Sequence, residues 1–498
     1  MDVDLSYQLY IGGQWSDAQD GEVVEVINPA TEEIIARVPQ ATAADVTRAI
    51  RSAREAFDSG PWPRMTPRQR SAMLVRFADA LERRRDDLVE LNITEAGSAR
   101  QLAEALQVDI PLAHFRDTAE RVLLSFAFEQ PMLPTVGQGL LPTVGQGLSQ
   151  GVLLREPAGV ASLISAYNFP LFLNLFKLAP ALASGCTAVL KPAPTTPLEA
   201  LVLGEIADEA GLPPGVLNVV TGDVSAGLEM TTSPLVDLVS FTGSDGVGRL
   251  VAEQAAPTLK RVVLELGGKS ANIICEDADL SKALPSVIQG IVTHAGQGCA
   301  LLTRTLVHRS RYDELVQMLT ATLAFITVGD PADPATMMGP LISAAQRDKV
   351  ESLIQAGIAD GATVAYGGGR PEGLSRGYFL EPTLLVDVDN TMAVAQREFF
   401  GPVGVVIPFD DDAHAVALAN ASDYGLAGGV WSADPVRAFT IAKQVRAGHL
   451  AVNGGGAGLS PHAAFGGVKQ SGLGREWGSF GLEEFLEYKT IEWPVAAG

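Results

Sequence analysis

Three side chains that could act together on a carbonyl carbon stand far apart in this chain, and the first is a thiol. Cys299 lies in HAGQGCALLTR, where Gly296 and Gly298 allow the backbone to approach a ligand closely. The apolar run that follows predicts a helix starting near Cys299, and a helix start stabilises a thiolate nucleophile. A lone cysteine is otherwise usually a buried structural residue, which is our interpretation of Cys186 and Cys275.

The other two candidates, Glu265 and Asn168, each follow an apolar run that is typical of a strand. Glu265 stands in VVLELGGKS, where desolvation would raise its pKa towards that of a general base. An ion pair with Lys269 is an equally good explanation of the same carboxylate. Asn168, in SAYNFP, could donate a hydrogen bond to a developing oxyanion, or it could be an ordinary turn residue before Pro170.

Two further segments suggest a nucleotide. FTGSDGVG, from Phe241 to Gly248, follows one strand and opens a helix, but it does not satisfy the G-x-G-x-x-G pattern. Lys191 in VLKPAP could reach a ribose or a phosphate, although most lysines at strand ends are simply solvated. Neither segment identifies a cofactor by itself.

The elements that must position these side chains are indicated by short apolar runs that begin near Gly159. Runs without polar alternation predict strands buried on both faces, as in a parallel sheet with helical crossovers. Ligands of such sheets bind at the carboxyl ends of the strands. The predicted ends are Asn168, Lys191, Gly222, Gly243 and Glu265. A second alternating stretch, from about Ala271 to Val452, predicts a second α/β domain.

The two ends of the chain look different from this core. Near the start, QLYIGGQW and EVVEVINP predict hairpin strands, while Thr42 with Asp45 and Thr66 with Pro67 mark two helix starts. The tail EEFLEYKTIEWPV predicts a strand that must pair elsewhere, with another subunit as one candidate. LPTVGQGL occurs at 133–140 and again at 141–148, which we interpret as a local duplication that lengthens a hairpin or loop.

Composition limits the classes of function. A chain of 498 residues is too long for one core, so at least two domains are expected. The net charge of -22 disfavours nucleic acid and anionic membrane partners. The start MDVDLSYQLY is unlike a signal peptide and no long apolar run occurs, so we expect a cytosolic protein. Three cysteines predict neither a disulfide framework nor a metal site.

The order of the motifs decides among these interpretations. It resembles the aldehyde dehydrogenase superfamily over nearly the whole chain, and ELGGK with a downstream GQxC is highly specific. The motifs are YNFP with Asn168, LKP with Lys191, FTGS from Phe241, LELGGKS with Glu265, GQGC ending at Cys299, REFFGP with Glu398 and Phe400, and FGGVKQSGLGRE near the end. The resemblance is to the NAD(P)-dependent branch that hydrolyses its thioester.

The resemblance implies an α/β fold with three parts. A Rossmann-like parallel-sheet domain that binds the dinucleotide would comprise residues 1–124 and 149–264. A second α/β domain, the catalytic one, would comprise 265–467. A small β element for oligomerisation would comprise 125–148 and 468–498, which implies a homodimer or homotetramer.

The resemblance also implies a reaction cycle. Cys299 would attack the aldehyde, and the amide of Asn168 with the backbone N–H of Cys299 would hold the oxyanion. Hydride would pass to the nicotinamide, and Glu265 would activate the water that hydrolyses the thioester. Lys177 matches the lysine that supports the site around Asn168.

For the cofactor, the resemblance implies that Lys191 and Glu398 hold the ribose hydroxyls and that Phe400 packs near the nicotinamide. Gly243 and Ser244 would let the pyrophosphate approach a helix start. The other implied cofactor residues are Ser165, Ala166, Pro194, Gly222, Phe241, Gly248 and Leu266. In many NAD-preferring members a glutamate stands where this chain has Pro194. Without that carboxylate neither cofactor is excluded electrostatically, so we expect NAD while NADP remains open.

The positions that match the family's substrate tunnel are all apolar or aromatic. They are Phe169, Phe172, Leu173, Phe176, Leu301, Leu459 and Phe465. Because no arginine is among them, a semialdehyde that carries a carboxylate would be left unpaired. We therefore expect an apolar aliphatic, terpenoid or aromatic aldehyde.

Three alternatives remain open at this point. A CoA-acylating enzyme would also use the cysteine, but such members generally lack the glutamate of ELGGK. A thiol esterase would not need Lys191 or Glu398. An inactive binding homologue would be expected to have lost at least one of Cys299, Glu265 and Asn168.

Overall fold

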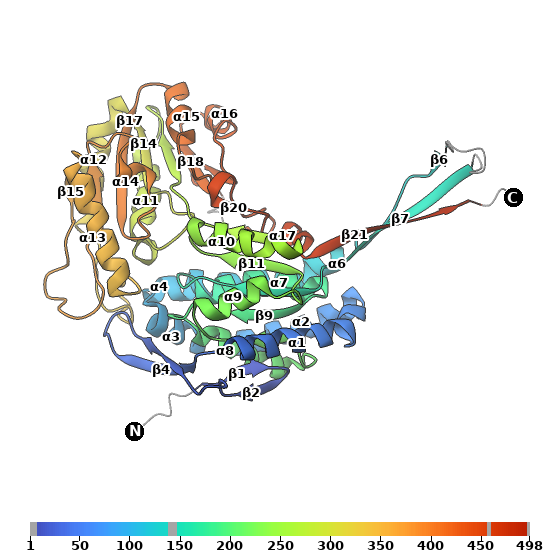
Figure 1. The fold of residues 1–498 in the computed structure, drawn as a ribbon. Coiled ribbons are helices and arrows are strands. Elements are labelled where there is room, and N and C mark those ends of the chain that lie inside the picture. The colour runs from blue at the N-terminus through green and yellow to red at the C-terminus, as the bar shows by residue number, and fades with distance from the viewer. Residues whose placement is uncertain (1–6, 138–146, 456–459, 496–498) are drawn as a thin grey trace.

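The computed structural model describes residues 7–137, 147–455 and 460–495, which form two sheet-based domains and a projecting arm (Figure 1). The first sheet has the strand order β2-β1-β10-β9-β8-β11-β12-β20. Its five central strands are parallel, which confirms the predicted parallel sheet. They are β10 (Leu217–Val219), β9 (Thr187–Lys191), β8 (Val160–Ile164), β11 (Leu238–Thr242) and β12 (Arg261–Glu265).

The burial of these strands explains their sequence. Every residue of β8, β9 and β11 is buried, so polar alternation is absent from all three. The edges are antiparallel: β1 (Leu9–Ile11), which forms a hairpin with β2 (Gln14–Ser16), pairs with β10, and β20 (Gly472–Leu473) pairs with β12. A separate small sheet joins β3 (Val23–Ile27) to β4 (Ile34–Pro39).

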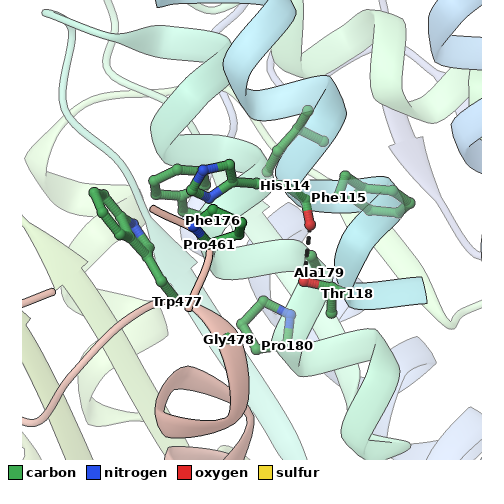
Figure 2. A pocket seen from close by; sticks show the side chains of 10 residues that line it. His114, Phe115, Thr118, Phe176, Ala179, Pro180, Pro461, Trp477 and Gly478 are labelled. Carbon is green, nitrogen blue, oxygen red and sulfur yellow. Dashed lines mark hydrogen bonds between the residues drawn. The ribbon is translucent and has the colours of Figure 1, made fainter. Parts of the chain in front are cut away.

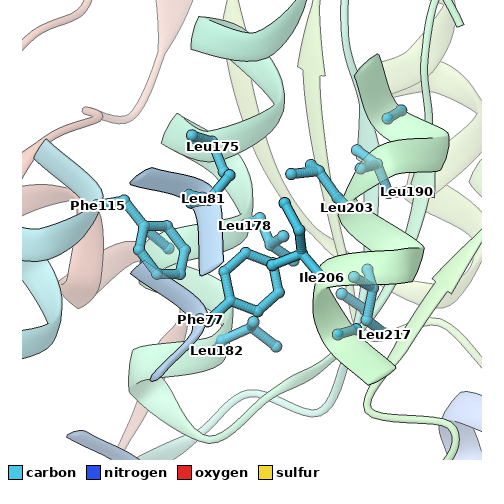
Figure 3. Close-up of a cluster of buried hydrophobic side chains, with 14 of the residues drawn as sticks. Phe77, Leu81, Phe115, Leu175, Leu178, Leu182, Leu190, Leu203, Ile206 and Leu217 are labelled. Atoms are coloured by element: carbon cyan, nitrogen blue, oxygen red, sulfur yellow. The ribbon is translucent and has the colours of Figure 1, made fainter. Parts of the chain in front are cut away.

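Helices cover both faces of the first sheet. Figure 3 shows the core that α2, α7 and α8 form against the sheet, with Phe77, Leu178 and Ile206 at its centre. The predicted capping boxes at Thr42 and Thr66 both form. The helices are α1 (Ala43–Asp58), α2 (Pro67–Arg83), α3 (Arg85–Ala96), α7 (Pro170–Ser184), α8 (Leu198–Ala210), α9 (Val224–Thr232) and α10 (Asp245–Ala255).

A helical run beyond α3 was not predicted from the sequence. It consists of α4 (Arg100–Leu102), α5 (Ile110–Asp117) and α6 (Leu123–Ser125), joined by π-helical turns at Ala103–Asp109 and Thr118–Val122. Such turns re-aim side chains and are frequent at functional sites. The first of them carries Gln107, which is wholly buried beside the candidate site.

The second sheet has the order β15-β16-β17-β14-β13-β18-β19 and is parallel except at β15, as expected for a second α/β domain. Its strands are β15 (Thr363–Tyr366), β16 (Thr383–Val386), β17 (Val403–Phe409), β14 (Arg304–His308), β13 (Ala271–Ile274), β18 (Ala427–Trp431) and β19 (His449–Val452). Its helices are α11 (Leu280–Val292), α12 (Tyr312–Leu323), α13 (Ala344–Ala359), α14 (Ala393–Gln396), α15 (Asp412–Asn420) and α16 (Pro435–Ala442).

The arm contains the tail strand. β21 (Leu486–Pro494) pairs antiparallel along its whole length with β7 (Gly147–Pro157), which also pairs with β5 (Glu129–Pro131) and β6 (Thr135–Gly137). The tail strand therefore pairs with a distant segment of the same chain, and another subunit is not needed to provide this partner. Part of the duplicated LPTVGQGL, residues 138–146, lies outside the described residues, so its interpretation stays a prediction.

The tail reaches the arm by way of the first domain. β20 joins the first sheet, and α17 (Gly478–Glu484) packs against α7 before β21 begins. β20 and α17 thus pack with the first domain, and the predicted domain boundaries stay predictions. Within the described parts of the chain, no helix is both long and apolar enough to cross a membrane.

Candidate active site

A cleft of about 570 Å³ opens at the carboxyl ends of β8, β9, β11 and β12 and is closed on the other side by loops of the second domain. Its volume lies in the usual range for cofactor and substrate sites. Asn168, Glu265 and Cys299 all line it. The three side chains that could act on a carbonyl are thus brought to one place, at the edge of the sheet where a parallel fold binds ligands.

Cys299 lies on a turn and not at a helix start. A short 3-10 segment (Thr293–Gly296) precedes it, residues 301–303 belong to no helix or strand, and β14 begins at Arg304. The predicted helix is wrong because the chain must run directly into β14, a central strand bonded on both sides. Within the 3-10 segment, His294 and Ala295 have φ of 48° and 52°, a left-handed conformation that is costly for residues other than glycine.

The electrostatics of Cys299 also differ from the expectation of a stabilised thiolate. Burial raises the pKa of this thiol above its ordinary value, and the charges of Glu265 and Glu398 raise it further. Hydrogen bonds from backbone N–H groups act in the other direction but do not overcome these effects. The thiol is therefore protonated at neutral pH, and a base must take its proton before it can attack.

Glu265 is the last residue of β12 and only 2% exposed. Neither of its carboxylate oxygens has a hydrogen-bond partner among the described residues. Burial raises its pKa well above the ordinary value, and the charge of Glu476 adds to this, while Lys177 and Arg475 oppose it. An unpaired carboxyl group with a raised pKa, facing the same cleft as a thiol, has the properties of a general base.

The alternative ion pair between Glu265 and Lys269 does not form. The amine of Lys269 lies 4.5 Å from the centre of the Phe399 ring and has no hydrogen-bond partner in the described structure. Burial lowers its pKa to about 7, with the charge of Arg304 acting in the same direction. Lys269 therefore packs as a largely apolar side chain behind the cleft.

Asn168 lies between β8 and α7 and is 2% exposed. Its Nδ2 donates to the backbone oxygen of Gln297 at 2.8 Å, two residues before Cys299. Its own backbone oxygen accepts a hydrogen bond from Nε2 of Gln107 at 2.9 Å. These bonds anchor the amide to the cysteine loop and leave its second N–H for a ligand.

Lys177 on α7 is wholly buried, and its bonds do not go to Asn168. Its Nζ donates to Oε1 of Glu476 at 2.8 Å and to Oγ of Ser240 at 3.1 Å. Because Glu476 and Lys177 both influence the pKa of Glu265, the pair adjoins the candidate base. Glu476 was not singled out from the sequence, although it ends the GLGRE motif that contributed to the resemblance.

Most of the predicted cofactor residues lie along the same cleft. Ten of the twelve line it, while Gly222 and Gly248 do not. Gly222 precedes α9, and Gly248 lies within α10, where a Cβ would come within 2.6 Å of the Leu266 side chain. The ten are Ser165, Ala166, Lys191, Pro194, Phe241, Gly243, Ser244, Leu266, Glu398 and Phe400.

Several cleft residues were missed by the sequence analysis because they carry no motif. Asp223, at the N-cap of α9, is one, and Gln346 and Lys349 on α13 are two more. Others are apolar side chains on α9 and α10, the two helices that flank the cleft. Their exposure to water is unfavourable unless a ligand covers them. They are Val224, Leu228, Val247 and Leu250, all partly or largely exposed.

One half of the cleft, made by the ends of the first sheet's strands and by the start of α10, has residues that fit a dinucleotide, and we call it the dinucleotide half. The N-terminus of α10, capped by the Ser244 side chain, presents free backbone N–H groups to the cleft, which favours a phosphate. The hydroxyl of Thr242 is buried there without a partner. At position 267 a Cβ would fall 2.3 Å from Oε2 of Glu398, so only glycine leaves this carboxylate its place.

Glu398 is held in a defined position by the same loop. Its Oε1 accepts a hydrogen bond from the backbone N–H of Gly268 at 2.9 Å. Burial raises its pKa to about 7, while that hydrogen bond and the charges of Lys349 and Lys269 lower it. A carboxyl group held in this way can accept hydrogen bonds from sugar hydroxyls.

The opposite half of the site is aromatic. Phe172, Leu173, Phe176 and Trp477 form one buried cluster, against which Phe169 and Phe465 pack. The rings of Phe465 and Trp477 stack with their centroids 4.5 Å apart. Five of the seven predicted substrate residues therefore lie together.

The remaining two predicted substrate residues lie elsewhere. Leu301 is half-buried beside Gly298 and is not part of the cluster, and Leu459 lies outside the described residues. Trp477 directly follows the motif FGGVKQSGLGRE and was missed because that motif, beyond its first residue, was assigned no role in the site. Behind the cluster, the ring of His114 stacks on Phe176 around a cavity of about 20 Å³, which is too small for more than a water molecule (Figure 2).

Comparison with known proteins agrees with this geometry. The model of the family described as "Aldehyde dehydrogenase family" matches residues 15–491. The chain belongs to the aldehyde dehydrogenase family. This confirms the predicted fold and the predicted enzyme class, an NAD-dependent aldehyde dehydrogenase.

The relatives span the chain from end to end. A 3-succinoylsemialdehyde-pyridine dehydrogenase from a Pseudomonas species is 44% identical over 487 residues, covering 97% of this chain and 98% of the relative. A geranial dehydrogenase from Castellaniella defragrans is 40% identical with the same coverage. The crystal structure of a Mycobacterium tuberculosis aldehyde dehydrogenase complexed with NAD+ is 44% identical, with a TM-score of 0.92 and 99% of both chains covered.

Proposed function

We propose that this aldehyde dehydrogenase oxidises an apolar aldehyde to its carboxylic acid through a thioester on Cys299, which a water activated by Glu265 hydrolyses. The observation that carries the proposal is that Asn168, Glu265 and Cys299, from three distant parts of the chain, line one cleft. The dinucleotide half of that cleft adjoins them, which supports a redox reaction over simple thiol ester hydrolysis.

In the first half-reaction Glu265 takes the thiol proton of Cys299, and the sulfur attacks the aldehyde carbon. The raised pKa of Glu265 makes it a competent acceptor near neutral pH. The developing oxyanion accepts hydrogen bonds from the second N–H of Asn168 and the backbone N–H of Cys299. A bound NAD+ supplies the hydride acceptor, and the substrate carbon becomes a thioester carbonyl.

In the second half-reaction Glu265, having released its first proton, takes a proton from water. The hydroxide attacks the thioester carbon, the same two N–H groups hold the oxyanion, and the sulfur of Cys299 leaves. Glu476 and Lys177 adjoin Glu265, and their opposite charges set how firmly it holds a proton.

The dinucleotide would be held by the residues of the other half. Gly243, Ser244 and the first turn of α10 would bind its pyrophosphate, while Lys191 and Glu398 would bind its riboses. Phe400 would pack beside the nicotinamide. The solved structure of the Mycobacterium tuberculosis relative in complex with NAD+ supports NAD as the cofactor.

The substrate class follows from the aromatic half. Among the described residues, neither the cluster of Phe172, Leu173, Phe176 and Trp477 nor the rings of Phe169 and Phe465 packed on it carry a charge to pair with a carboxylate. An aldehyde with an aliphatic, terpenoid or aromatic body would bury its apolar surface there. The names of two relatives, which refer to geranial and to a pyridine semialdehyde, agree with such a body.

We also propose that the protein is a homodimer or homotetramer. In the described structure β19 and β21 each have one edge without a partner strand. β21 also exposes Tyr488, Ile491 and Trp493, a set of apolar side chains that a second copy would cover. A single monomeric species in analytical ultracentrifugation would contradict this assembly.

The test of the proposed function is a panel of aldehydes assayed by NADH formation. Octanal, geranial and benzaldehyde should have a kcat/KM about a hundredfold above that of succinic semialdehyde, because a buried carboxylate without a partner costs several kcal/mol. Addition of CoA should leave the product as the free acid; formation of an acyl-CoA would instead identify the acylating reaction. Equal efficiency with succinic semialdehyde would exclude the proposed substrate class.

A further inference from the structure

The dinucleotide half of the cleft contains one carboxylate that none of the motifs includes. Asp223 follows β10, which lies next to β9 in the first sheet, and β9 ends at Lys191. Since neighbouring parallel strands end at the same edge, Asp223, Lys191 and Pro194 line the same part of the cleft. The two charged groups of this part of the cleft are the amine of Lys191 and the carboxylate of Asp223, and Pro194 lies with them.

The ligands that suit the two ends of this half of the cleft indicate that a ribose occupies the part between them. The N-terminus of α10, at Ser244, suits the pyrophosphate, and the exposed apolar side chains of α9 and α10, including Leu228 and Leu250, suit the adenine. The sugar that joins adenine to pyrophosphate must lie between them. In parallel-sheet nucleotide folds an acidic residue at a strand end bonds the 2′-hydroxyl of this sugar.

Asp223 is fixed in place and remains ionised. Its Oδ1 accepts hydrogen bonds from both the backbone N–H and the hydroxyl of Ser225, each at 2.8 Å, and the side chain of Gln40 also donates to the carboxylate. A carboxylate has about four acceptor positions, so it can accept a further hydrogen bond from a ligand. The bonds from Ser225 hold the pKa of Asp223 below its ordinary value, and Gln40 and the charge of Lys191 act in the same direction. The carboxylate therefore carries its full charge at neutral pH.

The positive charge available for a 2′-phosphate is small by comparison. Among the described residues that line the cleft the only cations are Lys191 and Lys349, and the second adjoins Glu398 in the other ribose site. Burial lowers the pKa of Lys191 to about 8, so its charge is incomplete above neutrality. Sites that bind a 2′-phosphate commonly use an arginine, and none lines this cleft in the described structure.

We propose that Asp223 selects NAD over NADP, by accepting a hydrogen bond from the ribose 2′-hydroxyl and by repelling a 2′-phosphate. It thereby replaces the carboxylate that Pro194 lacks. The inference rests on the proposed function only in requiring that this cleft binds a dinucleotide.

The chain offers a matched control for the test. Asp279 caps α11 in the second domain with the same arrangement, since its Oδ1 accepts hydrogen bonds from the backbone N–H of Ser281 at 3.1 Å and from its hydroxyl at 2.6 Å. It does not line the cleft. Asp223→Asn and Asp279→Asn remove the same charge and both keep a good N-cap, so they differ in what each carboxylate faces.

The experiment measures the dissociation constants of NAD+ and NADP+ by quenching of tryptophan fluorescence. Wild type should prefer NAD+ by about tenfold or more, Asp223→Asn should reduce that preference by about tenfold, and Asp279→Asn should leave it unchanged. Asp223→Ser, which also caps a helix, provides a second variant if the first does not fold. A preference that stays within about twofold of wild type in a folded Asp223 variant would overturn the proposal.

The same titrations separate this inference from the proposed function. If the dinucleotides bind with the expected preference but no aldehyde is oxidised, the proposed reaction fails and the role of Asp223 stands. If aldehydes are oxidised equally well with both cofactors by wild type, the role of Asp223 fails and the reaction stands. If neither dinucleotide binds, both are wrong.

Discussion

The two halves of the site, which are the cleft and the aromatic cluster that starts at Phe169 beside Asn168, are built in different ways. The dinucleotide half is made by the ends of buried parallel strands and by the start of α10, so backbone N–H groups, glycines and a few fixed polar side chains line it. The aromatic half is made by side chains of α7 and of the C-terminal segment, which meet only in the folded chain. Under the proposed function, the topology of the sheet would recognise the fixed cofactor, whereas the substrate would be recognised by side chains that can vary without changing that topology.

The largest expected effect comes from Cys299, which should be needed for the chemical step but not for binding of the cofactor. Cys299→Ala should abolish NADH formation, with a loss of at least about 10⁴ in kcat, because no other thiol is among the described residues that line the cleft. Binding of NAD+, measured by fluorescence titration, should stay close to wild type. Turnover in this variant would show that the nucleophile is elsewhere. Loss of NAD+ binding would show that Cys299 also contributes to binding of the cofactor.

The next effect concerns the base between the halves. Glu265→Gln should reduce steady-state kcat by about 10² to 10⁴, the usual contribution of a general base. At pH 9 hydroxide can remove the thiol proton, so a burst of NADH near one per active site should remain before turnover stalls. Stopped-flow absorbance measures both phases. A steady-state rate like that of wild type would exclude Glu265 as the base.

A smaller effect should be confined to the aromatic half. Trp477→Ala removes the ring that stacks on Phe465 and should raise KM for octanal or geranial by about tenfold, since burial of a large apolar side chain contributes about 1.5 to 3 kcal/mol. KM for acetaldehyde and for NAD+ should change little. Phe480, an exposed ring on the neighbouring helix, provides the control variant Phe480→Ala. An equal change for acetaldehyde would show general damage to the site.

The smallest effect is a shift of the pH profile. The negative charge of Glu476 raises the pKa of Glu265, and the base works only when it is ionised, so activity falls as pH decreases through that pKa. Glu476→Gln removes this charge and leaves Lys177 unneutralised, and both changes lower the pKa of Glu265. The acidic limb of kcat/KM should therefore move to lower pH. A shift to higher pH would contradict the arrangement of charges described above.

Most of the residues that the sequence predicted for the cofactor lie along one cleft, because the signals that mark them are local. An apolar run followed by Lys191 or by Glu265 marks the end of a buried strand, and the parallel topology then places those ends together. Glu476 and Trp477 could not be found in this way, since Lys177 and Phe176, which they contact on α7, lie in a distant part of the chain. Gln107 was missed because a π-helical turn, and no motif, brings it to Asn168.

Cys299 shows the opposite failure, in which a local signal was misleading. The run ALLTR after the cysteine favours a helix on propensity, but pairing of β14 with β13 and β17 requires an extended chain. Long-range strand pairing overrides local preference in the centre of a sheet. The consequence is chemical, because without a helix start the thiol has no dipole to lower its pKa.

The C-terminal segment combines features that are usually separate. From Gly472 the chain forms an edge strand of the first sheet, then supplies Glu476 and Trp477, and then enters the arm at Leu486. A truncation or a fused tag intended to alter only the quaternary structure would therefore also disturb Glu476 and Trp477. The first raises the pKa of Glu265, and the second belongs to the aromatic cluster. Catalytic assays on such variants would report on the anchoring of this segment as much as on assembly.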